Sequence, residues 1–284
     1  MPELPEVEIW ARRLGATLEG AEVESALAPG VVTMKTFDPP LSSLAGHTIT
    51  GTARHGKMLE LDFSGDLALL IHLMHGGRMR VFEKRASLRD KSARILLRLA
   101  DGRELRLVEF GTQQRAWGKL LPADKVAEDE MVSTLGPEAL PPPPVEQLAE
   151  LVRLPRHLHS LLRDQRVIAG IGRSWVDEIL WESLLSPFKR GADLDDDALQ
   201  RLHDAIGSTL QGALDHYEDV VPPDVVPDKP PMPLKVHNRQ GDPCPRCGTE
   251  LEAVFFRDYV TTYCPEEQTG GQVLKDRRLS RLLK

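Results

Sequence analysis

The stretch of sequence that decides both the fold and the chemistry reads MPELPEVE and spans Met1–Glu8. Removal of Met1 would leave Pro2 as an N-terminal secondary amine, and an α-amino group titrates near about pH 8, so part of it is an uncharged nucleophile in the cell. A secondary amine that attacks a sugar C1′ collapses to an iminium, which is a covalent Schiff-base intermediate. Glu3 stands beside this amine and can protonate a departing base or the ring oxygen. The stretch therefore predicts a nucleophile at Pro2 and an acid at Glu3.

The same residues also allow a purely structural interpretation as the beginning of a helix. Proline is favoured in the first helical turn, and carboxylates are stabilised at the positive end of the helix dipole. Apolar residues then recur every three or four positions, which predicts an amphipathic helix over residues 5–19 that ends before Gly20. The apolar face of this helix consists of Val7, Trp10, Leu14 and Leu18.

Composition bounds the architecture and the possible partners. The length of 284 residues predicts two domains with a sizeable core. The sequence has no apolar run of about 18 residues and no recognisable leader, so we expect no membrane span and a cytoplasmic location. Three cysteines at metal-like spacing fit a reducing compartment. The net charge of −7 argues mildly against nucleic acid, although the distribution of charge matters more than its sum.

Residues 21–120 carry an apolar pattern with a period of two, which is typical of strands. Ala100–Arg103 reads Ala-Asp-Gly-Arg, which is a hairpin signal. The region therefore predicts a β-sandwich or flattened barrel behind the first helix. The alternating segments are Thr48–Phe63, Leu67–Phe82, Ala93–Ala100 and Glu104–Phe110.

The second half of the chain has a helical pattern. A proline run at Pro141–Pro144 marks the boundary, and Pro222–Pro233 predicts a flexible connector at the surface. Gly170 and Gly172 predict the end of one helix and the beginning of the next, where a ligand can approach the backbone and free N–H groups can bind phosphate. As a bare pattern this is only a helix–turn–helix. Helices are expected over residues 145–153, 156–166, 173–185 and 195–218.

A candidate metal site follows the pattern Cys-x2-Cys-x16-Cys-x2-Glu and consists of Cys244, Cys247, Cys264 and Glu267. Cysteine pairs at this spacing are typical of zinc ribbons. A carboxylate can ligate Zn²⁺, although thiolate is softer and more usual in structural sites. The pattern predicts a structural zinc ion with Glu267 as the fourth ligand, and the alternative is a metal-free hairpin held by packing.

Taken in this order, the N-terminal stretch, the glycine-bearing helix pair and the cysteine cluster resemble the formamidopyrimidine-DNA glycosylase/endonuclease VIII family. The resemblance implies an α+β fold with an N-terminal helix and β-sandwich domain over residues 1–130. A helix–two-turn–helix DNA-binding domain over 131–233 and a zinc-finger-like β-hairpin module over 234–284 would follow. The implied activity is a DNA repair glycosylase and abasic-site lyase that flips a damaged base out of the helix. The implied partner is double-stranded or distorted damaged DNA, bound by a monomer.

The resemblance assigns catalytic roles to four residues. Pro2 would attack C1′, and Glu3 would act as acid and base. Glu6 would support the N-terminal helix and the amine. Lys57 follows Gly56 at a turn and matches the family's lysine that contacts the phosphates beside the lesion; a lysine at such a tip is otherwise simply solvated.

Phosphate contacts are also implied in the second half. Gly170, Gly172 and Arg173 would hold the DNA backbone, with Arg173 in place of the family's usual asparagine. The family's fingertip arginine is Tyr259 here, and Arg257 is a candidate substitute. The basic stretch 275–284 is either a further phosphate-binding arm or a solvated tail.

Residues that fill the space behind a flipped base depart from the family pattern. His75 stands in the position of the void-filling methionine, unless Met74 takes this role or packs in the core, and His72 fits a structural histidine. Phe110 matches the aromatic wedge. Glu109 replaces the arginine that pairs with the orphaned base, and an ionised carboxylate cannot donate a hydrogen bond.

These departures leave alternatives open. Donors for the orphaned base could come from residues 112–115, and Glu109 is otherwise an edge-strand surface charge. We expect bulky, alkylated or abasic lesions as substrates rather than 8-oxoguanine. The rival interpretation is a damaged-DNA or abasic-site binding protein with little turnover, which a retained Met1 would favour. An RNA-binding zinc ribbon is a further alternative, but it explains neither Pro2 nor the first half.

Overall fold

The computed structural model describes residues 1–30, 32–85, 87, 90–110, 113–257 and 259–274. The basic stretch 275–284 and Thr112 therefore lie outside the described residues. The chain forms two compact units, Met1–Thr134 with Leu214–Pro231 and Leu135–Ala213 with Met232–Lys284. Within the described ranges, no helix combines the length and apolar character that a membrane crossing requires.

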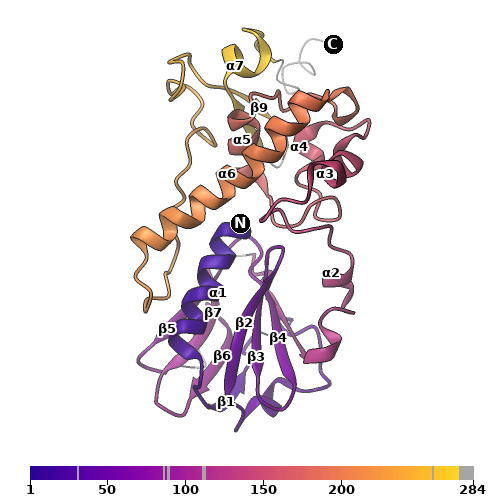
Figure 1. Cartoon of the computed structure of the whole chain (residues 1–284). Helices are drawn as coiled ribbons and strands as arrows, with labels where there is room; N and C mark the ends of the chain where they lie inside the picture. The colour runs from indigo at the N-terminus through magenta and orange to yellow at the C-terminus, as the bar shows by residue number, and fades with distance from the viewer. Residues whose placement is uncertain (31, 86, 88–89, 111–112, 258, 275–284) are drawn as a thin grey trace. The chain divides into compact units, whose positions relative to one another are not determined.

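The first unit begins with helix α1 (Leu4–Leu18), which confirms the helix predicted from the apolar spacing (Figure 1). Glu3 is its N-cap residue and Pro5 lies in its first turn, as the sequence favours. Its apolar side faces β2 and β3, so that Trp10 and Leu14 are buried in the core. The N-terminal motif is thus anchored to the sandwich by its own helix.

Two four-stranded antiparallel sheets follow, with strand orders β1-β6-β7-β5 and β2-β3-β4-β8 (Figure 1). Apolar side chains from both sheets share one core with α1, which confirms the predicted sandwich. The sequence pattern missed β1 and β8, because one is short and half polar and the other carries glycine and proline. The strands are β1 (Val23–Leu27), β2 (Ile49–His55), β3 (Met58–Phe63), β4 (Leu67–His72), β5 (Gly77–Phe82), β6 (Ala93–Leu99), β7 (Glu104–Glu109) and β8 (Trp117–Pro122).

Two hairpin turns of the first unit contain a glycine with a positive φ. The predicted turn before Arg103 is confirmed, with Gly102 at a φ of 94° between β6 and β7. Gly56 turns the chain between β2 and β3 at a φ of 56°, a left-handed conformation that glycine adopts without strain. This second turn leads directly into Lys57.

The second unit is helical and ends in a β-hairpin followed by a short helix (Figure 1). Helix α6 contributes its last turns, from Leu214 onward, to the first unit. An irregular chain follows α6 where a connector is predicted. The elements are α2 (Glu130–Ser133), which precedes this unit, then α3 (Val145–Val152), α4 (Leu158–Leu161), α5 (Arg173–Glu182), α6 (Asp196–Val220), β9 (Glu252–Phe255), β10 (Val260–Tyr263) and α7 (Pro265–Thr269).

The helix predicted over residues 156–166 is wrong in length, since α4 is a single turn. The side chain of Gln165 explains the early end. Its Oε1 accepts from the N–H of Gly170 at 3.0 Å and its Nε2 donates to the carbonyl of Ile171 at 2.8 Å. The Gln165 side chain thus supplies hydrogen bonds to backbone groups of the loop before α5, and no further helical turn forms there.

Candidate active site and nucleic-acid interface

Glu3 and Glu6 form a buried pair at the start of α1. Their residues are 1% and 3% exposed. Glu6 Oε2 accepts a 2.9 Å hydrogen bond from the backbone N–H of Glu3, one half of a capping box. The structural interpretation of the motif is therefore realised, and the same geometry fixes the peptide that follows Pro2.

Tyr217, on the part of α6 that belongs to the first unit, completes this arrangement. Its hydroxyl donates to Glu6 Oε1 at 2.6 Å, and the residue is fully buried. Burial, followed by the negative charge of Glu6, raises the pKa of Tyr217 well above its usual range, so the phenol remains a donor. The sequence analysis missed this residue, because an aromatic side chain on an apolar helix face reads as ordinary core.

The amino terminus lies in a partly desolvated environment, with Met1 39% exposed. Burial lowers the pKa of the Met1 amino group; Glu3 and Glu6 oppose this shift, and the charges of Lys57 and Lys229 add to it. A lowered pKa increases the uncharged fraction of an amine at neutral pH, as a nucleophile requires. This amine stands one residue ahead of Pro2.

Lys57 is buried, with 8% of the residue exposed. The alternative of a merely solvated lysine at a hairpin tip is therefore wrong. Its ammonium lowers the pKa of both the Met1 amino group and His72, which places its positive charge beside the N-terminal motif. The structure brings Lys57 together with the residues that the sequence analysis selected for catalysis.

The turn between β4 and β5 holds the histidines considered for void filling. His72 Nδ1 accepts the N–H of Met74 at 2.9 Å, and burial followed by the charges of Lys57 and His75 lowers the pKa of His72 to about 4. The structural role predicted for this residue is thus confirmed. Met74 has a left-handed backbone with φ 51° and is half-buried outside the core, and His75 is exposed.

Glu109 is buried, with 1% of the residue exposed, and ends a strand that lies between β6 and β5. The alternative of an edge-strand surface charge is therefore wrong. Its Oε2 accepts the N–H of Ala116 at 2.8 Å, so the carboxylate stabilises its own loop. The amide of Gln114 donates to the Glu109 carbonyl at 3.0 Å. Phe110 is 51% exposed beneath the guanidinium of Arg78, 5.3 Å from the ring centroid.

The proline-rich connector, whose flexibility stays a prediction, contacts the rest of the first unit at two places. The indole N–H of Trp10 donates to the Pro227 carbonyl at 2.6 Å. Arg78 and Arg80 both pair with Asp228, at 2.9 and 3.2 Å. Residues 222–231 thus belong to the same compact unit as the N-terminal motif.

The glycines of the second unit have the geometry expected of a helix pair. Gly170 has a φ of 103°, which is a glycine conformation, and Gly172 is the extended N-cap residue of α5. Arg173 is the first residue of α5. The N-terminal N–H groups of a helix and a guanidinium at its start together suit an anionic ligand.

Tyr259, which replaces the fingertip arginine, lies inside an aromatic cluster. Its ring stacks on Phe256 at 4.4 Å and on His159 at 5.3 Å between centroids. The guanidinium carbons of Arg163 and Arg173 lie 4.3 and 5.7 Å from its centroid. The substitute considered from sequence, Arg257, is exposed.

The candidate metal ligands converge as predicted: the ligand atoms of Cys244, Cys247, Cys264 and Glu267 all lie within 4.8 Å of one another. Cys247 Sγ and Cys264 Sγ are 3.4 Å apart, and Cys244 Sγ is 3.6 Å from Glu267 Oε2. A tetrahedral ion with metal–sulfur bonds of about 2.3 Å requires ligand atoms at about this separation. The four residues therefore fit a zinc ion.

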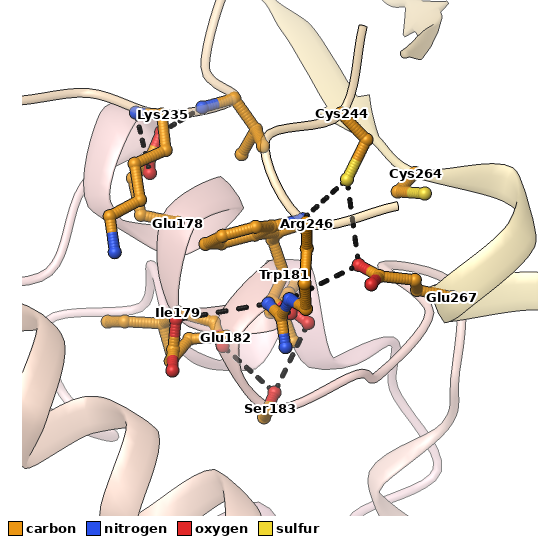
Figure 2. A network of polar contacts seen from close by, with 12 residues as sticks. Glu178, Ile179, Trp181, Glu182, Ser183, Lys235, Cys244, Arg246, Cys264 and Glu267 are labelled. Atoms are coloured by element: carbon orange, nitrogen blue, oxygen red, sulfur yellow. Dashed lines mark hydrogen bonds and ion pairs between the residues drawn. The ribbon is translucent and has the colours of Figure 1, made fainter. Parts of the chain in front are cut away.

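Hydrogen-bond donors surround this cluster (Figure 2). The indole N–H of Trp181 donates to Cys244 Sγ at 3.4 Å, and Arg246 Nε lies 3.4 Å from Glu267 Oε2. Arg246 also stacks over Trp181, 4.0 Å from the ring centroid. Gln268 Oε1 accepts the N–H of Cys264 at 2.7 Å. Hydrogen bonds of this kind orient the ligands of a metal site.

A buried carboxylate ties the finger module to α5. Glu178 is 3% exposed, and its two oxygens accept the N–H groups of Lys235, Val236 and His237 at 2.8–3.0 Å. The neighbouring Asp177 accepts from His237 Nδ1 at 2.7 Å. These bonds hold the chain that leads into the cysteine cluster.

Comparison with known proteins identifies the family. The sequence matches the formamidopyrimidine-DNA glycosylase N-terminal domain over residues 1–118 and the H2TH domain over residues 135–221. A formamidopyrimidine-DNA glycosylase from Roseiflexus sp. (strain RS-1) is 34% identical over 281 residues, covering 94% of this chain and 100% of the relative. A formamidopyrimidine-DNA glycosylase from Pediococcus pentosaceus is 33% identical over 280 residues, with 94% and 99% coverage.

Solved structures agree with this result. The chain superimposes on Lactococcus lactis Fpg in complex with abasic-site DNA, with a TM-score of 0.83, 27% identity, and coverage of 94% of this chain and 99% of that one. For the complex with N7-benzyl-Fapy-dG DNA the TM-score is 0.85 with 28% identity, and coverage is 94% and 100%.

The sandwich with its N-terminal helix, the helix–two-turn–helix region and the cysteine-bearing hairpin together define the fold of a helix–two-turn–helix DNA glycosylase. The chain belongs to the formamidopyrimidine-DNA glycosylase family. The fold and family predicted from the sequence are thereby confirmed.

Proposed function

We propose that this protein excises damaged bases from DNA and cleaves the resulting abasic site through a Schiff base on Pro2. The observation that carries the proposal is the buried arrangement of Glu3 and Glu6 at the start of α1, fixed by Tyr217 and placed beside the charge of Lys57. Support also comes from relatives named formamidopyrimidine-DNA glycosylase along nearly the whole chain.

In the proposed reaction the Pro2 nitrogen, freed by removal of Met1, forms a bond to C1′. The glycosidic bond breaks and its electron pair leaves with the base, which Glu3 protonates directly or through the sugar. The C1′–O4′ bond then breaks as Glu3 passes the proton of the Pro2 nitrogen to O4′, which leaves an iminium between Pro2 and C1′. The iminium acidifies the neighbouring C2′ proton; a base removes this proton, and β-elimination expels the 3′ phosphate. Glu6 would hold the N-terminal turn in place, and Lys57 would balance the negative charge of a flanking phosphate.

The proposed partner is double-stranded or distorted damaged DNA. Lys57 would contact a DNA phosphate from the first unit. In the second unit, DNA phosphates would be bound by the backbone of Gly170 and Gly172 and by the guanidinium of Arg173. Phe110, exposed at the end of β7, would fill the place of an extruded base together with His75. The relatives in the solved complexes hold abasic-site and N7-benzyl-Fapy-dG DNA, which supports damaged DNA as the ligand class.

The proposed lesions are bulky, alkylated or abasic rather than 8-oxoguanine. The carboxylate of Glu109 is occupied by the N–H of Ala116, and the position therefore offers no donor to the base left behind by flipping. A distorted or abasic site depends less on such a donor, because less free energy is needed to unstack the lesion from the helix.

The proposed cofactor is one zinc ion held by Cys244, Cys247, Cys264 and Glu267. It would act structurally, by linking the two ends of the β9–β10 hairpin module. We also propose that the chain functions as three parts, 1–130, 131–233 and 234–284. Limited proteolysis that cuts first inside one of these parts would contradict the division.

Borohydride trapping tests the central proposal. The processed protein, incubated with an abasic duplex and borohydride, should form a covalent adduct, and Pro2→Gly should reduce that adduct sharply. Glu3→Gln should lose base excision more than abasic-site cleavage, since the departing base most needs an acid. An undiminished adduct with Pro2→Gly would place the nucleophile elsewhere, and binding without any adduct would favour a damaged-DNA binding protein.

A further inference from the structure

We propose that Arg163 and Arg173, held on the ring of Tyr259, form a two-guanidinium cradle for one phosphate of the DNA backbone. The cradle takes over the task of the fingertip arginine that this chain lacks. The inference rests on the proposed function, and it adds Arg163 as a binding residue and Tyr259 as a positioning residue.

The geometry brings three separate segments to one point. Arg163 follows α4, Arg173 begins α5, and Tyr259 directly precedes β10. The two guanidinium carbons lie 4.3 and 5.7 Å from the Tyr259 centroid, within the range of cation–π attraction. All three side chains are half-buried, so they are held in place and still reach solvent.

Two further rings stack on the Tyr259 ring and hold it in place. Phe256 stacks on Tyr259 with an angle of 13° between the planes, and His159 stacks with an angle of 15°. His159 Nε2 lies 2.9 Å from the hydroxyl oxygen of Thr261, which pins that ring to β10. A rigid aromatic platform loses little entropy when a ligand binds, and a guanidinium that lies over a ring can still bind an oxyanion through its N–H groups.

The electrostatics confirm that positive charge converges here. The pKa of His159 is lowered to about 3, mainly by burial and then by the charges of Arg163, His237 and Arg173. The imidazole therefore remains neutral, and the positive field comes from the two arginines. Two like charges on one ring repel each other, and a shared anion relieves this repulsion.

The nearest carboxylate in sequence does not neutralise the cradle. Asp164, which directly follows Arg163, pairs instead with Arg156 at 3.0 Å. Within the described part of the chain, Arg163 has no ion pair with any carboxylate. Its charge is thus available to a ligand, and a planar guanidinium is the group best suited to grip phosphate with two bonds.

The test measures the affinity of the full-length protein for a duplex carrying a stable abasic-site analogue, over a series of salt concentrations. Arg163→Gln should reduce the slope of log affinity against log salt by about one, the value for one lost phosphate contact. Tyr259→Ala should weaken binding although it removes no charge, whereas Tyr259→Phe should retain wild-type affinity. Arg163→Gln should add little further loss in the Tyr259→Ala background, since both changes disable one cradle.

The matched control is Arg153→Gln, which removes a charge already paired with Asp196 in the same unit. An unchanged slope for Arg163→Gln, or an equal loss with Arg153→Gln, overturns the cradle. Borohydride trapping of the same proteins on a second duplex with a natural abasic site, whose C1′ can form the Schiff base, separates the two proposals. If the wild type forms the covalent adduct while Arg163→Gln keeps the full salt slope of binding, only the cradle fails. If the wild type neither binds the analogue duplex nor forms the adduct with the natural abasic site, both proposals fail.

Discussion

The hydroxyl of Tyr217 donates a 2.6 Å hydrogen bond to Oε1 of Glu6, and the other oxygen of Glu6 accepts the backbone N–H of Glu3 at 2.9 Å. Two residues more than 200 positions apart in the sequence therefore share one buried carboxylate. The same carboxylate closes the first turn of α1. The position of Glu3, and of the amine before it, thus depends on a phenol that belongs to α6.

Replacement of Tyr217 by phenylalanine removes this donor and retains the ring. A buried hydrogen bond to a charged group contributes about 1.5–3 kcal/mol, so we expect the free energy of unfolding to fall by about that amount. If Tyr217 positions the catalytic end, the rate of adduct formation should also fall more than substrate affinity does. Single-turnover borohydride trapping at saturating DNA measures that rate.

A double-mutant cycle with Glu6→Gln provides the control for Tyr217. The two changes should be strongly non-additive, because each removes the same contact. Additive losses would show that Tyr217 acts only as a core aromatic residue, and the positioning role would then be abandoned.

His72 makes the stability of the first unit depend on pH. Its pKa is lowered to about 4, mainly by burial and then by Lys57, while the unfolded chain takes up the proton near its ordinary value of 6.5. The stabilising contribution is therefore fully present above about pH 6.5 and is lost as pH falls toward about 4. The side chain is partly exposed, so we expect a loss of about 1–3 kcal/mol over this window.

Denaturant unfolding of the wild type and of His72→Asn at several pH values isolates this contribution. The amide of asparagine can still accept the N–H of Met74 but does not titrate, so the variant should lose less stability between pH 7 and pH 4. Other shifted groups, such as His159 and Asp177, are common to both proteins and cancel in the comparison. If the free energy of unfolding falls equally with pH in both proteins, the pH dependence does not come from His72.

Sequence patterns predicted the elements whose conformation depends on residues close together in the sequence. The spacing of Trp10 and Leu14 predicts α1, and the alternation of apolar and polar residues along β3 and β7 predicts strands, although every residue of β7 is buried. The length of α4 was not predictable, since Gln165 ends it through bonds to Gly170 and Ile171. The end of α4 therefore depends on the position at which α5 begins.

The site shows the same division. The cysteine spacing predicts the cluster because its ligands lie near one another in the sequence. The burial of Lys57, the inward orientation of Glu109 and the contact of Tyr217 with Glu6 depend on distant segments that pack against them. No pattern of neighbouring residues contains this information: the surface alternatives were wrong for Lys57 and Glu109, and Tyr217 was not predicted at all.

Zinc should bind to the cysteine cluster and stabilise the finger module. Elemental analysis of gently purified protein should find about one zinc ion per chain. Chelation should lower the melting temperature and change the fluorescence of Trp181, whose indole N–H lies 3.4 Å from Cys244 Sγ. Trp181→Phe should abolish the fluorescence change, which assigns it to this residue.

The fourth ligand can be tested separately. Loss of a residue that hydrogen-bonds to a metal ligand typically lowers metal affinity roughly 10- to 100-fold, and Glu267→Ala, which removes a ligand itself, should lower zinc affinity at least as much. Glu267→Cys should raise zinc affinity, because thiolate is a softer ligand than carboxylate. Zinc-free protein with a melting temperature that chelator leaves unchanged would establish the metal-free hairpin. Equal zinc affinity in Glu267→Ala would show that Arg246, rather than the metal, is the partner of this carboxylate.

The last prediction concerns lesion preference and follows from Glu109. Its buried carboxylate accepts the N–H of Ala116 at 2.8 Å and cannot pair with the base that flipping leaves behind. An unpaired polar contact costs about 1–3 kcal/mol, which corresponds to about a 5- to 150-fold disadvantage for a lesion that leaves an intact cytosine unpaired. Abasic and alkylated sites, which disturb the helix before binding, should suffer less.

Competition between three otherwise identical duplexes measures this preference: 8-oxoguanine opposite cytosine, an abasic site and an alkylated purine. We expect 8-oxoguanine to be processed slowest. Glu109→Arg, which introduces a donor, should narrow the gap, while Glu109→Asp, which retains a carboxylate and introduces no donor, should leave the gap unchanged. If 8-oxoguanine is processed as fast as the best of the other two, the exchange of arginine for Glu109 has no bearing on substrate choice, and the lesion proposal fails while the Pro2 chemistry remains.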